Sequence, residues 1–145
     1  MIDTFRGDYF FLSNFYEAPV IFDGIRYCNN EAAFQAQKCI NAEDRKAFST
    51  MNPSEAKKAG RKVILRSDWE IVKVDLMYKI VKAKFAQNID LALKLAATNN
   101  EELVEGNTWG DKIWGKVNGE GQNLLGKILM DIRDNILNWD KNYES

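Results

Sequence analysis

Glu31, Gln35 and Lys38 are the first residues whose types and spacing could do chemistry. At 100° per residue, positions i, i+4 and i+7 of a helix lie within about 60° of one another on one face. Two interpretations of the pattern are open. It is either a solvated stripe with a weak i,i+4 contact, or a carboxylate, an amide and an amine directed into a cleft. The second arrangement would suit acid–base or nucleophilic chemistry on a bound substrate.

A glycine-rich segment over residues 114–126 is a second candidate. Six of the nine glycines lie between Gly106 and Gly126. Gly119 and Gly121 permit a close backbone approach that a Cβ would block. The helix predicted to follow would direct N–H groups and a partial positive charge toward the loop, which favours a phosphate or pyrophosphate site. The alternative is an ordinary turn, because no strand–GxGxxG–helix unit of a dinucleotide fold begins here.

Carboxylates and aromatic rings flank the same loop. Glu105, Asp111, Trp109 and Trp114 are the residue types that bind a ribose and stack on a base. The alternative is that Trp114 anchors the core and Asp111 supports a turn.

Arg6 with Ser13 and Asn14 forms the fourth candidate. Arginine binds phosphate through two parallel hydrogen bonds, and Ser and Asn side chains donate to phosphate or sugar oxygens. The alternative is a solvated arginine near the chain terminus.

The elements that must position these residues follow from residue patterns. Asp23-Gly24, between Val20–Phe22 and Ile25–Tyr27, predicts a type I′ hairpin. Helices are expected over 30–48 with Asn30 as N-cap, over 53–60 after Asn52, from the cap Asp68, after Asn88, and over 122–137. Buried or short strands are expected at Tyr9–Leu12, Leu103–Glu105 and Ile113–Trp114, and a core stripe at Trp69, Val72, Leu76, Ile80 and Ala83. The pattern predicts one compact, mainly helical α+β domain with a small antiparallel sheet over residues 1–145.

Composition removes several classes of chemistry. The chain has no His, which excludes Ser-His-Asp and Cys-His catalysis and His-ligated zinc. Its 20 basic and 21 acidic residues give a net charge of −1, so no global basic field attracts long nucleic acid, although a local basic cleft is compatible with this balance. Cys28 and Cys39 are expected to be reduced and buried, since they form no metal motif. No signal peptide or membrane span is visible, and we expect a cytoplasmic protein.

Several of these pieces occur in a characteristic order along the chain. They are Leu12-Ser13-Asn14 before Phe15, the segments 30–38, 65–70 and 84–85, Leu103-Val104-Glu105, and the segments 111–115, 119–126 and 129–133. In this order the chain resembles the NADAR superfamily, the YbiA-like N-glycosidases, from about Thr4 to Leu137. One departure is visible: many members carry a His-aromatic pair where this chain has Ala32-Ala33.

The resemblance implies hydrolysis of an N-glycosidic bond in a ligand of ADP-ribose or ribose-phosphate character. Some members remove ADP-ribose from guanine in nucleic acid, reversing the modification made by a toxin. Others hydrolyse early riboflavin-pathway intermediates. By motif position, Glu31, Asp111 and Trp114 correspond to the activity-critical residues of the family, and Lys38 to its reactive lysine.

We therefore expect an enzyme with no cofactor and no metal. Glu31, Lys38 and Asp111 are its expected catalytic residues. The expected substrate-binding residues are Arg6, Ser13, Asn14, Phe15, Gln35, Glu105, Trp114, Gly115, Gly119, Gly121 and Asn123. The expected substrate is a nucleotide-like small molecule or ADP-ribosylated nucleic acid, and the resemblance admits an ADP-ribosyltransferase toxin as a paired partner. The hypothesis assumes that one pocket gathers the amine, the two acids and the glycine bend.

Two other interpretations predict different behaviour. A non-catalytic ADP-ribose or NAD-binding module would keep the phosphate loop and the aromatic platform without any need for the acids and the amine. A structural or partner-binding domain would have no tight ligand.

Overall fold

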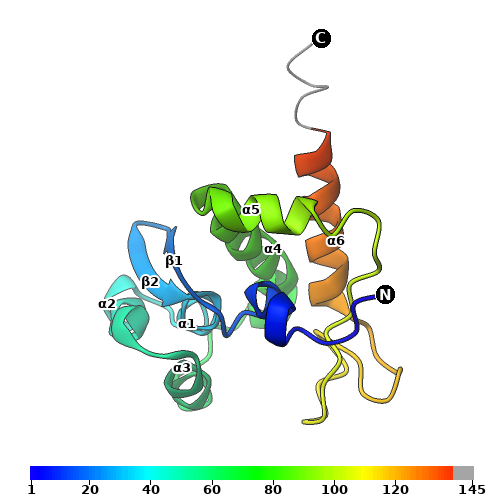
Figure 1. Ribbon diagram of the computed structural model, residues 1–145. Coiled ribbons are helices and arrows are strands. Elements are labelled where there is room, and N and C mark those ends of the chain that lie inside the picture. The colour runs from blue at the N-terminus through cyan, green and yellow to red at the C-terminus, as the bar shows by residue number, and fades with distance from the viewer. Residues whose placement is uncertain (139–145) are drawn as a thin grey trace. The chain divides into compact units, whose positions relative to one another are not determined.

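The computed structural model describes residues 1–138, which fall into two compact units. The hairpin unit is Asn14–Asn88. The glycine-loop unit combines Met1–Ser13 with the chain from Ile89 onward. Together their elements confirm the mainly helical α+β class with a small antiparallel sheet (Figure 1). No helix within residues 1–138 is long and apolar enough to cross a membrane.

The predicted hairpin opens the hairpin unit. Strands β1 (Glu17–Phe22) and β2 (Ile25–Asn29) pair antiparallel, with Phe22 opposite Ile25. The two turn residues, Asp23 and Gly24, have φ of 49° and 80°, as a type I′ turn requires. Val20 and Tyr27 are fully buried on the inner face of the hairpin. Cys28 is exposed, contrary to expectation, because alternate residues of β2 face solvent; Cys39 is buried as expected.

The helix expected over 30–48 is interrupted. Helix α1 (Asn30–Ala36) is capped by Asn29, whose side chain accepts from the amide of Ala32, so the cap lies one residue earlier than predicted. The chain then turns, and Asn41 caps a new helix, α2 (Ala42–Lys46), which continues as a 3₁₀ turn to Thr50. The Asn41 side chain satisfies an amide that would otherwise need a carbonyl from the preceding turn, and this local bond starts a second helix.

Two further helices complete the hairpin unit. Helix α3 (Pro53–Gly60) begins with the expected capping box between Asn52 and Glu55. Helix α4 (Trp69–Gln87) begins after Asp68, whose carboxylate pairs with Arg66 and makes no cap hydrogen bond. The buried face of α4 differs from the predicted stripe: Trp69 and Ile80 are buried as expected, whereas Val72, Leu76 and Ala83 are only half-buried. The remaining buried side chains of α4 are Met77, Val81, Lys84 and Phe85.

The glycine-loop unit contains α5 (Ile89–Ala96), α6 (Leu124–Leu137) and long connecting segments. Residues Gly7–Leu12 form a 3₁₀ helix, so the buried strand expected at Tyr9–Leu12 is wrong. Tyr9 and Phe10 are both 41% exposed, because only Phe11 and Leu12 face the core. The short strand expected at Leu103–Glu105 is reduced to an isolated bridge of Leu103 with Ile2. The strand expected at Ile113–Trp114 is wrong, because the amides of both residues donate to Asp111 Oδ1 within a bend. Leu125, Ile128, Leu129 and Ile132 form the buried face of α6, whereas Leu124 and Ile136, which share the apolar spacing, are half-buried.

Candidate functional site

Helix α1 is buried along its whole length, and this decides the interpretation of its polar residues. Glu31 is 8% exposed and Gln35 is 7% exposed. The Gln35 amide donates to Glu31 Oε1 over 2.9 Å, so the i,i+4 contact exists inside the hairpin unit. The solvated stripe is therefore excluded. A buried carboxylate and a buried amide need hydrogen-bond partners, so the contact between Glu31 and Gln35 restricts the positions of both side chains.

Lys38 lies just past the C-terminal end of α1. The helix ends at Ala36, and the Lys38 amide closes a tight turn by donating to the Gln35 carbonyl over 3.2 Å. Its ammonium lies 5.8 Å from the Trp69 ring centroid, and that ring lies 5.1 Å from Phe34. The half-buried Lys38 amine therefore lies beside the Trp69 ring, beyond the end of α1, and does not continue the helix face of Glu31 and Gln35.

The surroundings of Lys38 favour its neutral amine. Burial lowers the pKa of Lys38 below its ordinary value, the Glu31 carboxylate raises it by a smaller amount, and the Arg61 guanidinium lowers it further. A nucleophilic lysine at neutral pH needs such a depressed pKa. Burial outweighs the opposing effect of the Glu31 charge on the pKa of Lys38.

Asn14 and its neighbours position the start of α1. The Asn14 carbonyl accepts from the Glu31 amide over 3.0 Å, and its side chain accepts from Asn30 and donates to the Met77 sulfur. At 9% exposure, Asn14 contributes by holding Glu31 in place. Phe15 is half-buried, with the Lys57 ammonium 5.8 Å from its ring centroid. Ser13 belongs to the other unit, where its amide closes the 3₁₀ turn at Phe10.

In the glycine-loop unit, Asp111 organises a tight turn. Its Oδ1 accepts from the amides of Ile113 and Trp114 over 3.0 and 2.9 Å. The predicted turn role of Asp111 is therefore present. Its second oxygen, Oδ2, accepts no hydrogen bond from the described residues, so a carboxylate oxygen stays open to another partner.

Asn107, which the sequence reasoning missed, connects the acids of this loop. Its side-chain amide donates to Glu105 Oε2 over 3.0 Å and to the Asp111 carbonyl over 2.9 Å, while its oxygen accepts from the Asp111 amide. A Cβ on Gly115 would overlap the Glu105 carboxylate and carbonyl. Gly115 thus acts by letting the loop close onto Glu105.

The N-terminus of α6 differs from the predicted phosphate cradle. The amides of residues 122–125 donate to the carbonyls of Lys112, Gly115, Ile113 and Trp114, respectively. The N–H groups that were expected to be free for a phosphate therefore donate to carbonyls of the preceding loop. Asn123 is 3% exposed, and its side chain accepts from Glu105 N and donates to the Leu103 carbonyl. Asn123 and Gly121, where a Cβ would meet the Gly115 carbonyl, therefore hold the loop against the helix.

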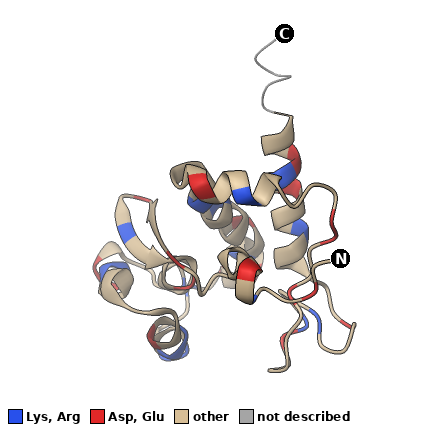
Figure 2. Cartoon of the chain, viewed as in Figure 1, with Lys and Arg blue, Asp and Glu red and all other residues tan. Residues whose placement is uncertain are grey.

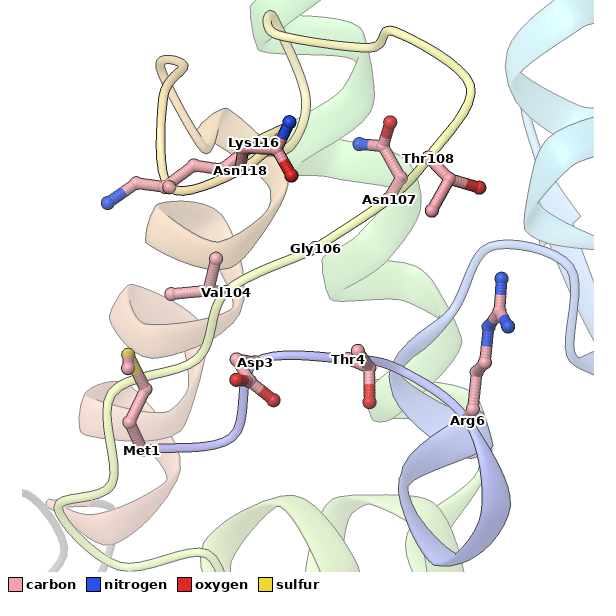
Figure 3. A pocket seen from close by; sticks show the side chains of 11 residues that line it. Met1, Asp3, Thr4, Arg6, Val104, Gly106, Asn107, Thr108, Lys116 and Asn118 are labelled. Atoms are coloured by element: carbon pink, nitrogen blue, oxygen red, sulfur yellow. The ribbon is translucent and has the colours of Figure 1, made fainter.

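Arg6 and Gly119 meet at a pocket of about 400 Å³ in the glycine-loop unit. Figure 3 shows Arg6 at one side of this pocket and Lys116 with Asn118 across from it, with Asn107 and Thr108 on the wall between. The size suits a small ligand. The lining combines the cations of Arg6 and Lys116 with the Asp3 carboxylate and with amide and hydroxyl groups, so it can hold the polar groups of a small ligand. Asp111, Trp114 and Glu105 are not among its lining residues.

Lys84 is a second amine that the sequence reasoning missed. It is 1% exposed, it lies on α4, and burial lowers its pKa to about 7. The expected core stripe left it out, because a lysine in a helical pattern is ordinarily assigned to the exposed face. Among residues 1–138, no cluster of three or more His, Cys, Asp or Glu side chains could hold a metal ion.

Comparison with known proteins shows the family of this chain. The model of the NADAR domain matches residues 3–137. The chain belongs to the NADAR family. Among its relatives, N-glycosidase YbiA of Escherichia coli strain K12 is 38% identical over 133 residues, covering 89% of this chain and 82% of the relative. The riboflavin biosynthesis protein VVA0006 of Vibrio vulnificus is 35% identical over 130 residues, which are 87% of this chain and 35% of that protein.

A solved structure of this NADAR family has the same fold. The NMR structure of the Escherichia coli protein YbiA matches with a TM-score of 0.80 and 36% sequence identity, covering 94% of this chain and 87% of that one. With this likeness and the relatives named N-glycosidases, this chain is an N-glycosidase. The enzyme interpretation is thereby confirmed over the non-catalytic binding module.

Proposed function

We propose that this NADAR protein hydrolyses the N-glycosidic bond between a base and the ribose of a ribose-phosphate substrate, with ADP-ribosylated guanine in nucleic acid as the favoured substrate. The observation that carries the proposal is the arrangement around α1, where a buried Glu31 accompanies a half-buried Lys38 whose pKa is lowered. An oxocarbenium-like transition state is stabilised by a nearby carboxylate, and a neutral amine can attack the same carbon.

In the covalent route, the Lys38 lone pair attacks the anomeric carbon. The electron pair of the carbon–nitrogen bond leaves with the base, which takes up a proton. The Lys38 nitrogen loses a proton, and opening of the ribose ring at its oxygen gives a protonated imine. Water then adds to the imine and releases the sugar as its aldehyde, which restores the free amine. Burial of Lys38 favours this route, because the amine must be neutral to begin it.

In the carboxylate-only route, the Glu31 carboxylate stabilises the oxocarbenium ion or activates the attacking water, and the leaving base takes up a proton. Arg6 and Lys116, which line the pocket of the glycine-loop unit together with Asp3, are our candidates for holding phosphate groups. Trp114 and Phe15 are our candidates for stacking against a ring.

Borohydride trapping separates the two routes. During turnover of ADP-ribosylated guanosine, reduction of an imine gives a stable secondary amine whose mass identifies the modified lysine. We expect the adduct on Lys38, and Lys38→Arg to abolish it. Turnover without any adduct would favour the carboxylate-only route, and an adduct on Lys84 would contradict our assignment.

A second candidate substrate is an early riboflavin-pathway intermediate. It is favoured by the similarity to the Vibrio vulnificus riboflavin biosynthesis protein. A panel containing ADP-ribosylated guanosine and the aminopyrimidine ribotide tests both, with free base and free sugar phosphate measured separately. Preference for the ribotide by a large factor would replace our favoured substrate, and hydrolysis of neither would contradict the proposed function.

A further inference from the structure

The chain carries a local cluster of positive charge that the proposed chemistry does not use. Between Glu55 and Asp68 there are five basic residues and no acidic one, in a protein whose net charge is −1. Arg66 is paired with Asp68 through two hydrogen bonds of 2.6 and 3.0 Å. The other four, which we call the α3 basic cluster, are Lys57, Lys58, Arg61 and Lys62 on α3 and just beyond it. Figure 2 shows blue residues gathered on this helix.

Most of this cluster faces solvent. Lys58, Arg61 and Lys62 are exposed, and Lys57 is half-buried. No ion pair with an acidic residue of the described chain holds Lys58, Arg61 or Lys62, and Glu55 is used in the capping box of its own helix. The pairs 57/61 and 58/62 have i,i+4 spacing, which sets their Cβ atoms about 5–6 Å apart along the helix. The cations therefore form a short row suited to a line of anions.

This row adjoins the Lys38 environment within the hairpin unit. The Arg61 charge is close enough to Lys38 to lower its pKa, and the Lys57 ammonium lies 5.8 Å from the centroid of the Phe15 ring. Gly60 allows this proximity, because a Cβ there would overlap the Gln35 side chain. The Gln35 Oε1 atom is buried and has no hydrogen-bond partner within the described chain. This oxygen, which lies next to Gly60 of α3, can therefore still accept a hydrogen bond.

Exposed apolar side chains continue the same surface. Ile64 is 84% exposed and Leu65 is 49% exposed, directly after the basic cluster. Proteins hold single strands with cations that follow the phosphates and with side chains on which bases pack, which are usually aromatic rings. Here Ile64 and Leu65 supply an aliphatic surface beside the cations.

From this arrangement we infer that the α3 basic cluster binds the phosphodiester backbone of a single-stranded polynucleotide next to the nucleotide being processed. The inference rests on the proposed function, because it treats Lys38 as the reacting group. It deepens that function by distinguishing a polymeric substrate from a free nucleotide. Its contacts are electrostatic and read no sequence, so a counterion-release signature is expected.

The test measures binding, so it does not depend on catalysis. The probe is a short, unmodified, fluorescently labelled oligothymidylate, and its anisotropy gives affinity between about 50 and 200 mM salt. Each phosphate contact to a single strand contributes about 0.7 to the slope of log affinity against log salt. The double variant Lys58→Gln/Lys62→Gln should reduce the slope by roughly 1.4. Over that salt range, the wild type then loses about sevenfold more affinity than the variant.

The matched control is Lys46→Gln/Lys82→Gln. It removes the same charge from two exposed lysines of the same unit that lie outside the cluster. The control should keep the wild-type slope, and thermal unfolding should report that both variants are folded. An unchanged slope in the Lys58/Lys62 variant, an equal loss in the control, or no binding by the wild type would each overturn the inference. Hydrolysis of ADP-ribosylated guanosine by the wild type, assayed in parallel, tests the proposed function separately.

Discussion

Replacing Lys84 with Met should remove a pH-dependent burial cost from the free energy of folding. The Lys84 side chain is 1% exposed on α4, and burial lowers its pKa from the ordinary 10.5 to about 7. Below pH 7 the folded protein must hold a buried ammonium, whereas the unfolded chain solvates the same charge. A depression of this size corresponds to a folding cost of roughly 5 kcal/mol at low pH and roughly 4 kcal/mol at pH 7. Methionine has a similar length and carries no charge.

The change in the free energy of unfolding should be smaller than this burial cost. The Lys84 ammonium lies 5.6 Å from the Tyr16 ring centroid and 5.3 Å from that of Phe85, and such contacts return about 0.5–2 kcal/mol each. The two contacts together return about 1–4 kcal/mol of the roughly 4 kcal/mol, so we expect Lys84→Met to raise the free energy of unfolding by no more than about 3 kcal/mol at pH 7.

The pH dependence gives the sharper measurement. Between the folded pKa near 7 and the ordinary value of 10.5, the unfolded chain binds the proton that the folded protein has lost. Stability therefore rises with pH across this window, by up to about 1.4 kcal/mol per pH unit for one proton. The burial cost is fully present below pH 7 and disappears as pH rises through 10.5.

Urea unfolding followed by tryptophan fluorescence, repeated from about pH 6 to pH 10, measures this slope. Lys84→Met should remove the Lys84 contribution to the slope. The control Lys82→Met changes an exposed lysine of the same helix and should leave the slope as in the wild type. If Lys84→Met keeps the wild-type slope, the buried amine does not account for the pH dependence of stability, and our reasoning about its burial is wrong.

Three further predictions concern the site. Lys38→Ala should lower the rate of base release more than about a hundredfold while leaving the thermal unfolding midpoint nearly unchanged, because a half-buried turn lysine contributes little to packing; normal turnover would remove Lys38 from the mechanism. The Arg61 charge lowers the pKa of Lys38 and the Glu31 charge raises it. In pH–rate profiles, Arg61→Gln should therefore move the rise in activity that follows deprotonation of Lys38 to higher pH, and Glu31→Gln should move the rise in its remaining activity to lower pH. Shifts of the same sign in the two variants would contradict this. Gly115→Ala should destabilise the protein by on the order of 3 kcal/mol, because its Cβ would overlap Glu105, and an unchanged midpoint in thermal unfolding would contradict the close approach.

Local bonding chemistry made much of the fold predictable. Asp23-Gly24 specifies its turn because both residues tolerate positive φ, and Asn52, Pro53 and Glu55 specify the start of α3 through one reciprocal pair of hydrogen bonds. The buried stripe of α6 follows from apolar spacing alone. In these places, sequence neighbours satisfy one another, so no distant segment is needed to determine the outcome.

Tertiary packing decided the features that the patterns misplaced. The residues Tyr9–Leu12 have strand composition but form a 3₁₀ helix, because within residues 1–138 no neighbouring strand supplies a ladder of hydrogen bonds for them. The amides at the start of α6 would be free in an isolated helix, but here they donate hydrogen bonds to the carbonyls of residues 112–115. A hydrogen bond between distant segments leaves no periodic trace in the sequence.

The sequence by itself determined the family, the absence of histidine chemistry and the residue types available for breaking an N-glycosidic bond. Only the tertiary structure decided how those residues behave. Burial of α1 converted Glu31 and Gln35 from a stripe open to solvent into a constrained polar pair, and burial lowered the pKa of both Lys38 and Lys84. The reason is that the free energy of a charge depends on how much water surrounds it, and that is set by every segment packed around the residue.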